Sequence, residues 1–139
     1  MKLTGQQPVS QALKLMDSRS GSTRSLEVAQ AALLARYAPG THVRRVRWSQ
    51  GETQVLELGS GPALLLVHGG MASGFYWAPI LRALAENRRV LVVDLPGHGL
   101  ADSFDYTDVH PLAHAATFLG EILNALGLPS VDIVANSLG

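Results

Sequence analysis

The sequence predicts an α/β fold in which an antiparallel hairpin leads into a parallel βαβαβ unit. Three short and nearly all-apolar segments indicate strands that are buried on both faces: Ala63 to Val67, Val90 to Val93 and Val131 to Val134. Helical patterns separate them, and this alternation is the order of a parallel sheet with right-handed crossovers. The composition agrees, because 47% of the 139 residues are apolar and only 16% are charged, which excludes a disordered chain.

A hairpin precedes the parallel part of the expected sheet. His42 to Gln50 alternates side chains of mixed polarity on both faces, which is typical of an edge strand. Gln50-Gly51 then turns the chain into a second strand, Thr53 to Leu58, and the Gly- and Pro-rich segment Gly59 to Pro62 ends it.

Two helices are expected between the buried strands. The first has apolar residues at helical spacing from Trp77 to Ala85 and tolerates Pro79 in its first turn. The second is capped by Thr107 or Asp108 and ends at Gly127. Its expected apolar stripe consists of Leu112, Ala115, Ala116, Leu119, Ile122, Leu123 and Leu126.

Residues 1–40 are predicted to be a partly helical N-terminal extension that precedes the main α/β part, residues 41–139. A short helix over Val9 to Met16 is expected first, followed by a flexible joint over Ser18 to Thr23. Ser25 then caps a longer helix.

Charge and cysteine content restrict the classes of protein. The net charge is zero, yet residues 1–50 hold eight Lys or Arg against two acids and residues 51–139 hold three against nine. The basic residues are scattered, with no run longer than Arg44-Arg45, which argues against a nucleic-acid partner. The absence of cysteine excludes a thiol nucleophile and a cysteine-based zinc site.

Nothing in the sequence resembles a membrane span or a secretory signal, because the apolar runs are short and no apolar region follows Met1-Lys2. We therefore expect a cytoplasmic protein. The Ser- and Arg-rich, acid-poor stretch up to Arg36 leaves a transit peptide as the alternative.

Polar and glycine-rich segments directly follow the three buried strands. They are His68 to Gly74, Asp94 to Gly99 and Ala135 to Gly139. Because ligands bind outside the carboxyl ends of parallel strands, we expect these segments to share one rim and to form the functional site.

The last of these segments predicts a serine nucleophile. A strand followed by small-x-Ser-x-Gly is the pattern of a nucleophile elbow, in which a tight strand-to-helix turn exposes the hydroxyl of Ser137. The backbone is crowded there, so small residues are required two positions before and after the serine, and Ala135 and Gly139 meet that demand. The alternative is a strand-ending turn without chemistry.

The first of these segments matches the elbow, because acyl transfer needs backbone N–H groups aimed at the developing oxyanion. We expect Gly70 and Leu138 to supply those two donors. Met71 is an alternative donor or a pocket-lining side chain, and Met71 and Asn136 are the residues expected to contact substrate. In the alternative interpretation, Gly69-Gly70 merely turns the chain.

The runs Leu64 to Gly70, Val93 to Gly99 and Asp132 to Gly139 together closely resemble the α/β-hydrolase superfamily in its serine-nucleophile branch, over about Val43 to Gly139. The resemblance implies the α/β-hydrolase fold, here truncated after the nucleophile elbow, with the serine as nucleophile and oxyanion donors in the first loop. Asn136 beside the serine also resembles the elbow of C–C bond hydrolases that act on meta-cleavage products.

Two parts of the catalytic machinery are expected outside the sequence. The triad of this fold follows the order Ser, Asp or Glu, His, and the sequence ends two residues after Ser137. His68 and His98 are expected to shape their loops rather than to act as bases, and Asp94 is expected to be a structural carboxylate. The chain alone is therefore predicted to be inactive.

No metal or organic cofactor is implied. His110 and His114 are four residues apart on a helix, as in a metal-binding pair, but a solvated helix face is the favoured interpretation. Gly97 to Asp102 begins like a dinucleotide-binding loop and fails at the third glycine.

The prediction is a hydrolase that acts on an ester or related carbonyl compound, a small-molecule substrate, through Ser137. The alternatives are a C–C bond hydrolase and a non-catalytic interaction module on the same scaffold, because a fold does not define one function. The sequence leaves the oligomeric state open.

Overall fold

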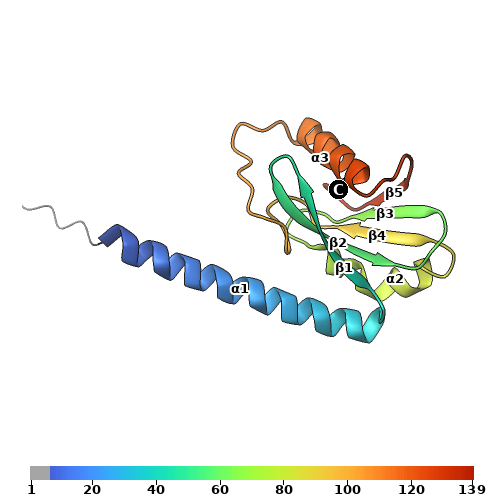
Figure 1. Ribbon diagram of the computed structural model, residues 1–139, viewed down its shortest axis with the longest axis horizontal. Helices are drawn as coiled ribbons and strands as arrows, with labels where there is room; N and C mark the ends of the chain where they lie inside the picture. The colour runs from blue at the N-terminus through green and yellow to red at the C-terminus, as the bar shows by residue number, and fades with distance from the viewer. Residues whose placement is uncertain (1–6) are drawn as a thin grey trace, which may run out of the picture.

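The computed structural model describes the backbone of residues 7–139 and the side chains of residues 21–139. This part of the chain forms a long helix followed by a five-stranded sheet with further helices (Figure 1). In chain order the elements are α1 (Gln7–Tyr37), β1 (His42–Trp48), β2 (Gly51–Leu58), β3 (Ala63–Val67), the 3₁₀ helix η1 (Gly74–Trp77), α2 (Ala78–Leu84), β4 (Arg89–Val93), α3 (Pro111–Ala125) and β5 (Asp132–Ala135).

The strand order in the sheet is β1-β2-β4-β3-β5. β1 pairs antiparallel with β2, β2 pairs antiparallel with β4, and β3 lies parallel to both β4 and β5. The expected hairpin and the expected parallel βαβαβ unit are therefore both confirmed, and β1 is an edge strand as predicted. β5 forms the opposite edge.

Helices cover both faces of the sheet: α1 and α2 lie on one face and α3 lies on the other (Figure 1). Successive strand residues point to opposite faces, so each central strand contributes to both layers of the core. On the first face Leu64 and Leu66 pack with Leu81 of α2. On the second, Leu65 and Val67 pack with Phe118 of α3.

The long helix corrects the prediction for the N-terminal region. α1 runs without interruption from Gln7 to Tyr37, so the joint expected over Ser18 to Thr23 and the cap expected at Ser25 are both wrong. Ser25 Oγ instead donates to the carbonyl oxygen of Gly21 (3.0 Å), one turn earlier in the helix. The end of α1 is part of the core, because Leu34 is buried there. Residues 1–6 of the expected extension lie outside the described residues.

The start of α3 also differs from the prediction. The helix begins at Pro111, and His110 is its N-cap, with Nδ1 accepting a hydrogen bond from the Ala113 N–H (3.4 Å). Thr107 and Asp108 precede it in a turn, so the expected cap there is wrong. Asp108 has φ of 58°, a left-handed conformation that is incompatible with a helix start.

The expected apolar stripe of α3 is confirmed in part, because Ile122 is buried and Leu119, Leu123 and Leu126 pack against the core. Phe118 and Ile122 are the residues fully buried against the sheet, whereas Leu112, which the periodicity assigns to the core, is 76% exposed. The prediction is therefore wrong for Leu112 and misses Phe118, which the expected stripe does not include. Within the described residues, no helix is long and apolar enough to cross a membrane.

Two glycines provide a matched test of this packing. A Cβ at Gly59, which has φ of +83°, would press against the Arg88 carbonyl and lie 2.6 Å from that of Ala85. Gly120, inside α3, has nothing within 4 Å of its Cβ position. In urea denaturation, Gly59→Ala should lower the free energy of unfolding by about 2 kcal/mol or more. Gly120→Ala should raise it by up to about 1 kcal/mol, because alanine is the better helix former. Equal effects of the two substitutions on the free energy of unfolding would contradict the crowding at Gly59 and the open space at Gly120.

Candidate active site

The three candidate loops meet at one end of the sheet. Val67 of β3 is paired with Val93 of β4 and with Ala135 of β5, so the parallel strands end level with one another. Beyond the last strand pair, the Asn136 N–H donates to the Val67 carbonyl oxygen (3.1 Å) and continues the ladder into the turn. The common rim expected for these loops is therefore present.

Ser137 lies in a tight turn directly after β5. Its φ is 55°, and the Gly139 N–H closes the turn by donating to the Asn136 carbonyl oxygen (2.9 Å). A non-glycine residue with positive φ is uncommon and indicates that the surroundings impose the conformation. At Gly139 a Cβ would lie 2.7 Å from the Val67 carbonyl oxygen and 2.9 Å from that of His68. The crowding expected at Gly139 is thus a feature of the structure.

The glycine loop after β3 packs against this turn. A Cβ on Gly69 would lie 3.1 Å from Ser137 Cβ, and a Cβ on Gly70 would lie 3.0 Å from Leu138 Cδ1. The residues expected to provide oxyanion donors are therefore neighbours in space. Across the described part of the chain, neither the Gly70 N–H nor the Leu138 N–H has a backbone acceptor.

A hollow of about 630 Å³ opens beside Ser137 on the α3 side. Gly70, Ser137 and Leu138 line it together with α3 and the loop after β4, and none of the described lining residues is Asp, Glu, Lys or Arg. The two residues expected to contact substrate lie elsewhere on the rim. Met71 is fully exposed with φ of 59°, and Asn136 is exposed beside Gly69.

His68 connects two of the loops. Its side chain is fully buried; Nδ1 donates to the Gly69 carbonyl oxygen (2.7 Å), and Nε2 accepts from the Leu95 N–H (3.0 Å). This pattern requires the neutral imidazole, since each nitrogen has a fixed role. Burial, the largest influence, lowers the pKa of His68 below its usual 6.5, although the Gly69 hydrogen bond and the Asp94 charge oppose it. His68 therefore shapes its loop, as predicted.

Asp94 is a structural carboxylate, as predicted, and it is 1% exposed. Oδ1 accepts from the Gly74 N–H (2.5 Å). Oδ2 accepts from the Leu100 N–H (2.9 Å) and from Gln54 Nε2 (3.2 Å). Three N–H donors from separate segments therefore converge on one buried side chain at the rim.

His98 also shapes its own loop, because Nδ1 donates to the Pro96 carbonyl oxygen (2.9 Å). Its ring lies 5.4 Å from that of His68 between centroids. His98 also lines the hollow beside Ser137.

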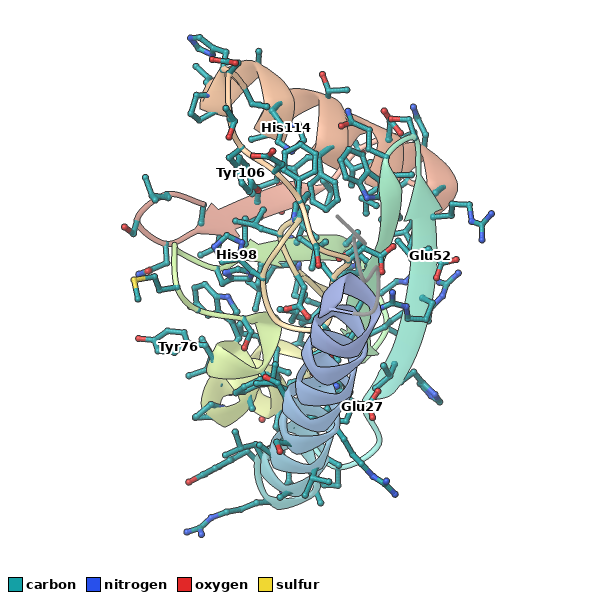
Figure 2. All side chains as sticks on the ribbon, turned by 90° about the vertical axis from the view of Figure 1, so that its left-hand side faces the viewer. Glu27, Glu52, Tyr76, His98, Tyr106 and His114 are labelled. Carbon is teal, nitrogen blue, oxygen red and sulfur yellow. The ribbon has the colours of Figure 1, made fainter. Side chains whose placement is uncertain are left out.

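The interpretation of His114 as part of a solvated helix face is wrong. Its ring stacks on Phe104 (4.3 Å between centroids, 20° between planes) and meets Trp48 and Tyr106 edge-on. Figure 2 shows Tyr106 beside His114. The loop before α3 folds back over the helix and encloses the ring. Sequence periodicity contains no signal for that contact.

The other histidine of this pair, His110, caps α3 instead of binding a metal with His114. Among the residues that the structure describes, no three or more His, Asp or Glu side chains gather in a way that could hold a metal ion.

A mixed sheet that begins with an antiparallel hairpin, and a serine in a strained turn beside a glycine loop, together define an α/β hydrolase. The chain belongs to the α/β hydrolase family, whose family model matches residues 64–139.

Relatives and solved structures agree with this assignment. The chain is 45% identical over 56 residues to the pimeloyl-[acyl-carrier protein] methyl ester esterase of Xanthomonas campestris pv. campestris, a match that covers 40% of this chain and 21% of the esterase. The carboxylesterase CesB (YbfK) of Bacillus subtilis superimposes with a TM-score of 0.74 at 23% identity, over 85% of this chain and 42% of that one. An epoxide hydrolase from an endophytic Streptomyces has a TM-score of 0.66 at 32% identity, over 73% and 31%. These matches thus cover less than half of each of the three proteins.

The buried imidazole of His68 makes stability depend on pH. Its pKa is lowered by burial in the folded state, so the unfolded chain binds the proton more readily below about pH 6.5. The free energy of unfolding should therefore be lower at pH 5.5 than at pH 7.5 in urea titrations at constant ionic strength. His68→Gln should show less of this decrease.

The other described groups with shifted pKa values titrate outside the range from pH 5.5 to pH 7.5. Hydrogen bonds from Arg89 and Thr107 lower the pKa of Glu57 and of Asp105 below 4.5 and 3.8 respectively, and burial raises the pKa of Tyr106 above 10. Equal stability at the two pH values, or an undiminished decrease in His68→Gln, would contradict the assigned role.

Proposed function

We propose that this chain supplies the nucleophile and the oxyanion-binding loops of a serine hydrolase that cleaves an ester or a related carbonyl compound. The observation that carries the proposal is the turn at Ser137, which has positive φ and packs against Gly69 and Gly70. The turn exposes the hydroxyl at the carboxyl ends of the parallel strands, where ligands of α/β sheets bind.

In the proposed reaction, Ser137 Oγ attacks the carbonyl carbon of the substrate while a histidine takes the hydroxyl proton. The N–H groups of Gly70 and Leu138 hold the oxyanion that forms on the carbonyl oxygen. The histidine then protonates the leaving group, and water hydrolyses the acyl-enzyme. One such donor is worth about 2.7–4 kcal/mol of transition-state stabilisation.

The base and the acid come from sequence beyond Gly139 in this proposal. Support comes from His68, the buried histidine of the glycine loop, because both of its ring nitrogens hold loops and neither is left to act as a base. The matched relatives are also longer than the chain. We propose that residues 41–139 are the amino-terminal half of the hydrolase domain and that residues 1–40 extend it.

The serine separates this proposal from the other branches of the family. Epoxide hydrolases and dehalogenases of this fold use an aspartate at the nucleophile position, so Ser137 favours acyl transfer. The names of the curated esterases support the same class. A C–C bond hydrolase remains the second candidate, because Asn136 precedes the serine as it does in that group, and it lies against the glycine loop through Oδ1.

The proposal is tested in the extended protein, defined as this chain continued in frame past Gly139. Ser137→Ala should lower hydrolysis of p-nitrophenyl butyrate by at least about a thousandfold and abolish labelling by a fluorophosphonate probe. Ser130→Ala, an exposed serine before β5, is the matched control and should keep both. Ser137-independent labelling or turnover would refute the nucleophile assignment.

The isolated 139-residue chain should not turn over the same ester, because it lacks the proposed base. Turnover is measured with the chain and with its Ser137→Ala variant side by side. Serine-dependent turnover by the isolated chain would show that a described residue acts as the base.

A further inference from the structure

A buried pair of amide side chains joins α1 to the sheet. Gln30 of α1 and Gln54 of β2 are only 5% and 2% exposed. Gln30 Nε2 donates to Gln54 Oε1 (2.9 Å), and Gln54 Nε2 donates to Gln30 Oε1 (2.7 Å). The same Gln54 nitrogen also donates to Asp94 Oδ2 (3.2 Å). A glutamine amide has two N–H groups, so both of those on Gln54 are used.

This arrangement defines the orientation of the Gln54 amide. If the amide flipped, its oxygen would face both the Gln30 oxygen and the Asp94 carboxylate, and buried acceptors that face one another are costly. Asp94 therefore decides which end of the Gln54 amide faces it, and Gln30, which pairs with both the oxygen and the nitrogen of that amide, holds it in place beside the carboxylate. The helix thus helps to hold the donor that the carboxylate receives from the sheet.

Asp94 transmits this restraint to the rim. Its two oxygens also hold the Gly74 N–H, at the end of the glycine loop, and the Leu100 N–H, in the loop after β4. The glycine loop is tied a second time, because His68 bonds Gly69 at one nitrogen and Leu95 at the other. Gln30 is therefore connected to the loop that presents Gly70, through Gln54 and Asp94.

We propose that Gln30 is a positioning residue for the Ser137 site, which makes α1 a working part of the hydrolase rather than a dispensable extension. The inference rests on the proposed function for the chemistry at that site. Apolar packing also holds α1, because Leu34 and Ala38 lie in the core. The amide pair adds orientation, which apolar packing does not supply.

Two substitutions in α1 separate positioning from packing. Gln30→Met keeps the length of the side chain and removes the amide, leaving Gln54 without its partner. Leu34→Ala removes apolar packing one turn later and keeps the amide pair. Glu27→Gln, at an exposed position of the same helix, controls for substitution as such.

The first readout is amide hydrogen exchange in the full 139-residue chain. In Gln30→Met, exchange at Gly74 and Leu100 should accelerate by about tenfold relative to the core amide of Leu65. In Leu34→Ala, all three amides should accelerate together, and in Glu27→Gln none should. An unchanged ratio in Gln30→Met, or the same selective acceleration in Leu34→Ala, would overturn the proposal.

The second readout is catalysis by the extended protein. Gln30→Met should lower kcat for the ester by about tenfold with KM within about twofold, because the oxyanion loop is misplaced while the substrate surface is kept. Leu34→Ala should keep kcat at temperatures where it is folded. Unchanged kcat in Gln30→Met overturns the positioning role. A wild-type protein without esterase activity would refute the proposed function instead, and the exchange ratio would still decide whether α1 holds the loops.

Discussion

The architecture of the rim depends on one buried negative charge. Asp94 lies at the end of β4 with almost no exposed surface, and an ionised carboxylate in such a place is stable only if hydrogen bonds replace the lost water. Gln54, Gly74 and Leu100 provide those bonds from a strand, the glycine loop and the loop after β4. Because all three segments donate to the same carboxylate, they are tied to one another at the rim beside Ser137.

Local patterns predicted the strands and the tight turn at Ser137. Each buried strand is a short apolar run, and the residues around Ser137 meet a steric demand that acts within five residues, so both can be recognised in isolation. The same holds for Gly59, where a left-handed backbone ends β2. By contrast, the apolar stripe of α3 is decided by the element that it meets. Phe118, which the expected stripe does not include, packs edge-on against Trp48 of β1, 70 positions earlier, whereas Leu112 is exposed.

Contacts between distant residues also explain what sequence reasoning missed at the site. Gln30 and Gln54 are 24 residues apart, and each alone is an ordinary polar residue in a helix or a strand. Only the fold makes them buried partners. Ser25 shows the reverse case, since its local preference for a cap yields to a continuous helix that docks through Leu34. Helix propensity is a weak influence that tertiary packing overrides.

The two halves of the candidate site are held by different means. The glycine loop is tied by a buried carboxylate and a buried imidazole, and neither can leave its partners without exposing an unpaired polar group to the core. Ser137 is held by a backbone turn whose strained φ costs about 1–3 kcal/mol. β5 pairs with β3 but leaves Ile133 and Val134 about half exposed. The glycine loop is therefore tied by buried side chains, whereas the turn at Ser137 follows an edge strand with two half-exposed apolar residues and is held mainly by backbone hydrogen bonds.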